Sequence, residues 1–585
     1  MSIHEDLSAL ETAGLIRLAQ MEPELEYLFR HELLRDAVYH NMVRHMRKGH
    51  HQAVAESIEA LYPDRLDELA PVLAYHFDEA DDRARALHYL TRAGDVAFAR
   101  FASTEAAQHY GRALELARTG VAAVPLEEIA RLYGRIGESL EHSGRFDEAL
   151  RRYGEMRALA EDRGRPQMAL DALMAQATIR SAPNSMHDTE QARQLTDEAL
   201  ALARRLGNQE AEATILWNLL LMYSAAGDNE TAIEYGERSL AIARALNLRR
   251  QLAFTLSDLA SHAYVEAGMF DKALAVLEEA RPIWVELGDR PMLADSLCGL
   301  ALCHYMRGSF DKVIEASAEA QAVSESIHNL WGQSYSRFVL SDVLAERGHF
   351  DQGIGVMNEA IEMGDRAGFV LAGVGVRSYL ARALGYLGRY ADGIAVARVA
   401  AERAGEVMPG WLGWPVSTLA RLLVWSGDVD GAEAELAAIR GGEKTLFPVG
   451  LEYQLAEGEL ALARGDADGA LRHAEALLGQ MRLTGARLNL ADVLLVRARA
   501  LGALEKAGDT LAALDEARQA AEGQGALRIL WQILAGQAEL EADPARSAAL
   551  RGEARRIVAE IAGEIGEAEL RESFLGLAEV RALDG

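Results

Sequence analysis

The chain has 585 residues, of which 50% are hydrophobic and 25% are charged, and its formal charge at pH 7 is -29. This composition excludes a disordered chain, and the acidic balance argues against nucleic acid as a partner, because phosphate binding needs a basic field. The first residues lack the basic and then apolar order of a signal peptide, and no run of about 18 apolar residues occurs. We therefore expect a cytoplasmic protein without a membrane partner.

Residues 1–30 differ from the rest of the chain. The segment Leu7 to Ala13 predicts a short helix that stops at Gly14. Two apolar runs follow, Leu15 to Ala19 and Leu25 to Phe29, and they predict the strands of a small hairpin. A short helix followed by a hairpin resembles the end of a winged-helix domain.

An eight-residue segment, AGMFDKAL at residues 267–274, recurs with variations along the chain. Its glycine predicts the end of one helix, and the residues after it predict the start of an antiparallel partner. The aspartate three residues after the glycine is expected to cap the second helix, with the preceding aromatic residue just outside the cap. The glycines are Gly268, Gly308, Gly348 and Gly388, with weaker copies at Gly227, Gly427 and Gly465; the aspartates are Asp147, Asp271, Asp311 and Asp351.

Two columns of small residues accompany this turn, one five residues after the glycine and one seven residues before it. Small side chains at both places predict that the two helices of a repeat approach closely there. The first column is Ala149, Ala232, Ala273, Val313, Gly353, Gly393, Ala432 and Ala470; the second is Gly137, Ser261, Ala301, Ser341, Ala381, Ala420 and Gly458, with Leu220 as the exception. Irregular joints are predicted at residues 182–188, 408–415 and 441–448.

The pattern of Ala260, Ser261 and Tyr264 before the turn resembles the tetratricopeptide repeat, although the spacing here is about 40 residues instead of about 34. The resemblance implies an all-α superhelix of helical hairpins whose first helices line a concave groove. The predicted domains are residues 1–30 (end of a winged helix), 31–120 (helical junction and first repeat), 121–440 (tetratricopeptide-like repeats) and 441–585 (C-terminal repeats and cap).

Three segments near the N-terminus have more distinctive sequences than the repeats: FRHELLRDAVY at 29–39, LAYHFDEA at 73–80 and ALHYLTRAGDVA at 86–97. They resemble the junction between the ATPase core and the repeats in bacterial signal-transduction ATPases with numerous domains, including cyclase-linked ATPases and maltose-regulator-like activators. The resemblance implies that this chain is a sensor arm. No GxxxxGK[ST] motif occurs in it, so the ATPase activity of that family does not carry over.

The resemblance also implies which side chains face the groove, namely those about ten and six residues before the turn glycine. The candidate ligand-binding residues at these positions are Trp217, Asp258, His262, Phe338, Asp342, Arg382 and Arg421. Their charge changes from acidic to basic along the chain, which could orient an extended peptide or hold an acidic group on Arg382 and Arg421. The alternative is that they are solvated or pair between neighbouring repeats.

No catalytic, metal or cofactor motif is complete in the sequence. His31 and Glu32 begin a zinc-protease motif, but Arg35 stands where the second histidine is required. The two cysteines, Cys298 and Cys303, lie about 140° apart around one helix and cannot bond to each other there. We therefore expect no enzymatic activity.

The sequence favours a non-enzymatic regulatory module that binds a protein or peptide in its concave groove and signals to an ATPase, a cyclase or a DNA-binding domain. The alternative is a sensor of the same architecture for a small-molecule effector. An aromatic-walled pocket with converging charges near Phe338 and Arg382 favours the sensor, whereas an open charged channel favours the peptide-binding module.

Overall fold

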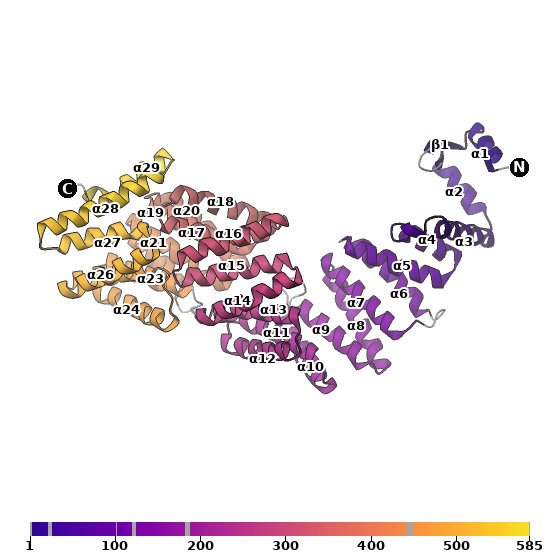
Figure 1. The fold of residues 1–585 in the computed structure, drawn as a ribbon, viewed down its shortest axis with the longest axis horizontal. Coiled ribbons are helices and arrows are strands. Elements are labelled where there is room, and N and C mark those ends of the chain that lie inside the picture. The colour runs from indigo at the N-terminus through magenta and orange to yellow at the C-terminus, as the bar shows by residue number, and fades with distance from the viewer. Residues whose placement is uncertain are drawn as a thin grey trace. The chain divides into compact units, whose positions relative to one another are not determined.

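The computed structural model describes residues 3–20, 26–100, 102–119, 124–181, 186, 188–440 and 449–583. The chain divides into two compact units, Met1–Asn208 and Gln209–Gly585. Helices dominate both units (Figure 1). The domain boundaries predicted at residues 30, 120 and 440 are not tested by this division and stay predictions.

The first unit begins with α1 (Ile3–Thr12) and an antiparallel hairpin of β1 (Ile16–Gln20) and β2 (Glu26–Phe29), in which Ile16 lies opposite Phe29. The predicted helix and hairpin are confirmed, and the residues between the strands lie outside the described part of the chain. Antiparallel helices follow: α2 Glu32–Asn41, α3 Arg44–Leu61, α4 Ala70–Ala80, α5 Arg83–Ala99, α6 Ser103–Arg118, α7 Leu126–His142, α8 Phe146–Asp162, α9 Pro166–Ser181 and α10 Thr189–Leu206.

In the second unit each helix packs against the next, so that successive helices form hairpins. The first four hairpins are α11 Gln209–Ala225 with α12 Asn229–Ala245, α13 Arg249–Leu259 with α14 Phe270–Leu287, α15 Arg290–Met306 with α16 Phe310–Ser326, and α17 Leu330–Glu346 with α18 Phe350–Ala367. A π-helical segment, Ala260–Tyr264, extends α13, and another, Ala372–Val376, precedes α19.

The later hairpins of the second unit continue this arrangement to the C-terminal cap. They are α19 Arg377–Tyr386 with α20 Tyr390–Val407, α21 Gly413–Ser426 with α22 Val429–Ile439, α23 Val449–Ala463 with α24 Ala467–Thr484, α25 Leu490–Ala503 with α26 Ala507–Gln524, and α27 Leu527–Leu540 with α28 Pro544–Glu564; α29 Ala568–Leu575 and α30 Ala578–Ala582 follow. The predicted joint at 408–415 contains a short 3₁₀ turn, Pro409–Trp411, whereas residues 441–448 and most of 182–188 lie outside the described residues.

The two small-residue columns meet, as predicted. A Cβ atom added at Gly393 would lie 2.7 Å from the carbonyl oxygen of Ala381, and one added at Gly353 would lie 3.0 Å from that of Ser341. Ala273, in the same column, is 0% exposed. The backbones of paired helices are therefore close enough at these places that a larger side chain has no room.

The predicted aspartate caps are wrong. The second helix of these repeats begins at the aromatic residue, so Asp271 is its second residue, and no side chain caps the helix start at Met269. From that position the carboxylate favours the helix through the helix dipole and pairs outside its own turn, as Asp271 does with Arg307 at 3.4 Å. The helices of Asp147, Asp311 and Asp351 begin in the same way and also lack a side-chain cap. Side-chain caps occur instead directly after the turn glycine, at Asp228, Asp428 and Asp466.

The second unit folds back on itself, because its later repeats lie against the turns of its earlier ones. The carbonyl oxygen of Met306 accepts hydrogen bonds from the backbone N–H groups of Arg487 (2.8 Å) and Leu488 (3.2 Å). Helix α27 contacts α17, and α28 contacts α18. We call the later repeats, which lie against these turns, the second layer. The four turn glycines spaced by 40 residues all face it: Gly268 faces Thr484, Gly308 faces Gln524, Gly348 faces Ile561 and Gly388 faces Ser573.

We predict that Gly348→Ala destabilises the chain more than Gly227→Ala. Both glycines have positive φ, +90° and +76°, so each alanine costs about 1 kcal/mol of backbone strain. A Cβ atom at Gly348 would also lie 2.9 Å from Ile561 Cγ1, whereas no atom of the described residues would lie within 4 Å of one at Gly227. Overpacking adds about 1–3 kcal/mol to the first variant only. Urea unfolding of both variants measures the difference; equal losses would contradict the contact between the layers.

Candidate functional site

Four predicted groove residues lie in the interior of the second unit. Phe338, Asp342, Arg382 and Arg421 are each only 2% exposed. They come from α17, α19 and α21, and the repeats that fold back cover them. Around these four residues the helices are packed against one another. That the four residues bind a ligand stays a prediction.

The charges of Arg382 and Asp342 meet each other across neighbouring repeats. Arg382 Nη2 donates to both carboxylate oxygens of Asp342 at 2.8 and 2.7 Å, and its Nη1 donates to Glu452 at 2.5 Å. Glu452 also accepts a hydrogen bond from Arg421 Nη1 at 3.0 Å. Its two arginine partners hold the pKa of Glu452 below its usual value against the opposing effect of burial. Pairing between neighbouring repeats, the alternative interpretation of these residues, therefore occurs here.

The same network continues into the repeats that fold back. Arg528 Nε lies 2.9 Å from both carboxylate oxygens of Glu346, a residue 182 positions away, and its Nη2 donates to Asp492 at 2.7 Å. Arg421 forms two hydrogen bonds with Glu459, at 3.1 and 2.9 Å. Burial raises the pKa of Glu346 to about 7, although Arg528 opposes this effect. The network joins five carboxylates (Asp342, Glu346, Glu452, Glu459 and Asp492) with three guanidinium groups.

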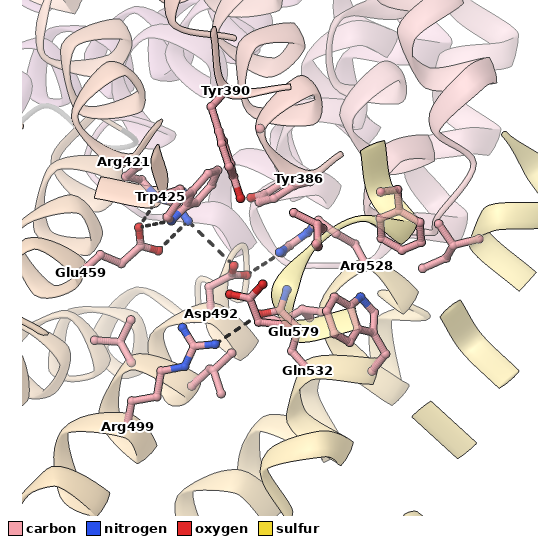
Figure 2. Close-up of a pocket in the computed structure, with 18 of the residues that line it drawn as sticks. Tyr386, Tyr390, Arg421, Trp425, Glu459, Asp492, Arg499, Arg528, Gln532 and Glu579 are labelled. Atoms are coloured by element: carbon pink, nitrogen blue, oxygen red, sulfur yellow. Dashed lines mark hydrogen bonds and ion pairs between the residues drawn. The ribbon is translucent and has the colours of Figure 1, made fainter. Parts of the chain in front are cut away.

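A cavity of about 150 Å³ lies beside this network (Figure 2). Helices α19 to α21, α23, α25 and α27 form most of its wall, and the start of α18, α28, α29 and the start of α30 contribute the rest. The buried hydroxyl group of Tyr386 has no hydrogen-bond partner among the described residues. The aromatic wall consists of Phe350, Tyr386, Tyr390, Trp425, Trp531 and Phe574. An aromatic-walled pocket with converging charges therefore exists at Arg421, one repeat away from the expected place at Phe338 and Arg382.

The other three predicted residues gather at the start of the second unit. The indole N–H of Trp217, on α11, donates to Asp258 Oδ2 on α13 at 2.7 Å. His262 Nε2 lies 3.9 Å from Asp258 Oδ1, and the His262 side chain is 54% exposed. The ring of Phe254 lies 5.6 Å from that of Trp217. These residues are only partly covered and can be reached from solvent.

Two further residues belong with this group and were missed from the sequence. Asp295 on α15 lies beside Asp258, and its carboxylate has neither a hydrogen bond nor an ion pair within the described chain. Burial raises the pKa of Asp295 to about 7, and the charge of Asp258 adds to the effect. Burial raises the pKa of Tyr335 on α17, and the charge of Asp295 adds to the effect. Asp295 and Tyr335 each lie thirteen residues before a turn glycine. This is about one helical turn before the groove positions ten residues before the glycine that the resemblance implies. We call Trp217, Phe254, Asp258, Asp295 and Tyr335 the acidic-aromatic row.

Other kinds of site receive no support from the described residues. No cluster of three His, Cys, Asp or Glu side chains in the described ranges is placed to hold a metal ion. Cys298 and Cys303 are free and buried, and burial raises the pKa of Cys303 to about 12. Within the same ranges, no helix combines the length and the apolar composition needed to cross a membrane.

Residues 184–245 and 251–326 match the tetratricopeptide repeat family. No curated protein matches the chain. Among solved structures, the chain is similar to a Rap protein complexed with competence and sporulation factor, with 13% identity over 64% of this chain and 99% of that chain and a TM-score of 0.44. It is also similar to a signal-transduction ATPase with numerous domains and a tetratricopeptide repeat sensor from Pyrococcus horikoshii (14% identity, 75% of this chain, 58% of that chain, TM-score 0.37) and to yeast Tom70 (13%, 86%, 96%, 0.33). With its paired helices, the chain is an all-α, tetratricopeptide-like superhelix.

Proposed function

We propose that this chain is a non-enzymatic regulatory module that binds a segment of a protein partner on the acidic-aromatic row and signals its occupancy to an ATPase, a cyclase or a DNA-binding domain. Tetratricopeptide repeats are typically protein-interaction modules, which supports the first part of the proposal. The observation that carries it is the carboxylate of Asp295, which lies beside Asp258 and forms no hydrogen bond or ion pair with the described residues. The buried network at Arg382 and Arg421 is a poorer place for a peptide, because its charges are already paired.

The chemistry of the row favours a basic side chain as the group that is bound. Two neighbouring carboxylates repel each other, and a cation between them removes that repulsion. Aromatic faces such as those of Trp217 and Phe254, whose ring centres are 5.6 Å apart, attract a cation further. We therefore propose that a lysine or arginine of the partner lies against Asp258 and Asp295.

Selection of peptides from a random displayed library tests this proposal. We expect sequences selected on the full chain to be enriched in lysine or arginine and to lose at least about tenfold in affinity with Asp295→Asn, since one charge-assisted contact is removed. Glu278→Gln, an exposed change on α14, is the matched control and should leave affinity unchanged. Enrichment of acidic sequences, or equal affinities for Asp295→Asn and the unaltered chain, would contradict the proposal.

The pH dependence of the selected peptide supplies a second readout. A bound cation favours the ionised form of Asp295, whose pKa is about 7 without a ligand. Affinity should therefore rise between pH 6 and pH 8, by up to about tenfold per pH unit below that pKa, and Asp295→Asn should flatten the rise.

A small-molecule sensor is the second candidate function. The aromatic-walled cavity beside Arg421 favours it, because charges converge there and the Tyr386 hydroxyl group has no hydrogen-bond partner in the described part of the chain. The two functions use different parts of the second unit, so they can be tested separately.

A further inference from the structure

We infer that the cavity of Figure 2 binds a small neutral aromatic molecule that carries a hydrogen-bond acceptor. The inference names a ligand class for the small-molecule sensor, so it rests on that second candidate function and not on peptide binding at the acidic-aromatic row. It follows from the charges around the cavity, which are paired, from the neutral polar groups of its wall, which are not, and from its aromatic lining.

The buried charges that line the cavity already have partners. Arg421 forms two hydrogen bonds with Glu459, at 3.1 and 2.9 Å. Arg528 donates to Asp492 at 2.7 Å. These four side chains make two ion pairs of opposite charges, so they leave no excess charge of either sign on this part of the wall.

The charges at the cavity mouth are also balanced in number. One cation, Arg499, and one carboxylate, Glu579, line the mouth, and both are exposed to solvent. The remaining carboxylates of the buried network do not line the cavity; they are Asp342, Glu346 and Glu452. A charged ligand would therefore lose its hydration without gaining a buried partner that is still unpaired among the described lining residues.

The polar groups of the wall that lack partners are neutral. The buried hydroxyl group of Tyr386 has no hydrogen-bond partner within the described ranges, and the Tyr390 hydroxyl and the Trp531 indole N–H form no hydrogen bond with described residues either. Both tyrosines project into the cavity in Figure 2. Burial raises the pKa of Tyr386 and of Tyr390, so both hydroxyl groups keep their protons and can donate. Because an indole N–H only donates, a ligand with a carbonyl oxygen or a ring nitrogen suits this set best.

The lining and the size of the cavity favour an aromatic ring. Guanidinium groups already cover Tyr386 and Trp425, at 4.3 and 5.0 Å from the ring centres. The other four aromatic residues of the wall have no such contact with the described residues; they are Phe350, Tyr390, Trp531 and Phe574. Aromatic rings pack favourably against one another at their edges and faces. About 150 Å³ is the volume of cavities that admit benzene, so a ring compound with roughly six to nine heavy atoms fits.

Calorimetric titration of the full chain with four compounds of similar shape tests the inference. Benzamide is neutral and carries a carbonyl acceptor, benzoate is an anion, benzamidinium is a cation, and toluene has no polar atom. We expect benzamide to bind at least about tenfold more tightly than each of the other three, because only benzamide satisfies the neutral donors without bringing a charge into the cavity.

The other outcomes separate this inference from the sensor function. Tighter binding of benzoate or benzamidinium in the cavity would keep the sensor function and overturn the neutral ligand class. Binding of toluene as tight as that of benzamide would make the site an apolar cavity and overturn the acceptor. No binding of any of the four compounds would overturn the inference and the sensor function together, whereas peptide binding at the acidic-aromatic row would be unaffected.

Two variants locate the binding. Tyr386→Phe and Tyr390→Phe should each weaken benzamide by about five- to tenfold and leave toluene unchanged, because each removes one hydroxyl group and keeps the ring. Neither hydroxyl group has a partner among the described residues, so both variants should fold. Tyr75→Phe, the same change at a 53% exposed position on α4, is the matched control. Unchanged benzamide affinity in both test variants would place the compound elsewhere, and equal losses for benzamide and toluene would mean that the hydroxyl groups only shape the cavity; either result would overturn the inference.

Discussion

Replacing Ala273 by glutamate should lower the free energy of unfolding by about 3 kcal/mol or more. Ala273 is 0% exposed and lies in the column of small residues where the two helices of a repeat approach most closely. A glutamate there would bury an unpaired carboxylate and would also overfill the contact. Urea unfolding, followed by circular dichroism, measures the loss.

Ala275→Glu is the matched control for this change. It places the same side chain two residues later on α14, at an exposed position. Exposed substitutions in a helix change stability by about 0.5 kcal/mol or less, so the control should unfold at nearly the urea concentration of the unaltered chain. If the two variants unfolded together, Ala273 would not lie in the close contact, and the register inferred from the repeat would be wrong.

The repeat could be predicted because its causes are local. A turn glycine with positive φ and small residues where helices meet impose the same requirements in each copy, so they recur every 40 residues. The aspartate caps were predicted wrongly for an equally local reason. Beginning the helix at Phe270 instead of after Asp271 shifts the carboxylate by two positions, and helix starts are among the least certain features of a sequence.

The interior of the second unit could not be predicted, because the side chains that pair with each other there are distant in the sequence. Arg382 and Arg421 lie at the predicted groove positions. Glu452 and Asp492, which pair with them, come from repeats whose turns do not show the eight-residue motif clearly. The glycines did carry a signal of this packing. Gly308 and Gly348 admit the later repeats against their turns, whereas Gly227 and Gly427 face open space. A single sequence does not distinguish a turn glycine that is required only for its positive φ from one that is also required because another repeat packs against it.

Arg528→Met should cost about 3–5 kcal/mol, because it leaves two buried carboxylates without their main partner. Arg528 is 4% exposed and holds Glu346 on α17 to Asp492 on α25. Methionine keeps most of the length of the side chain, so lost charge dominates over lost volume. Urea unfolding gives the total cost, and hydrogen exchange in α17 and α27 shows whether the layers separate first. Arg555→Met, at an exposed position on α28, should change stability by about 0.5 kcal/mol or less.

The pH dependence of this cost separates lost charge from lost packing. The pKa of Glu346 is about 7 in the folded chain, above its value in the unfolded chain, so the stability that its bound proton provides is lost as pH rises through 7. Removal of Arg528 raises that pKa further, because the cation that favours the ionised form is gone. The variant should therefore lose more stability at pH 8 than at pH 6, and Glu346→Gln added to Arg528→Met should remove much of that difference. A cost that is the same at both pH values would mean that Arg528 holds the layers together by packing, and that the charge of Glu346 plays no part.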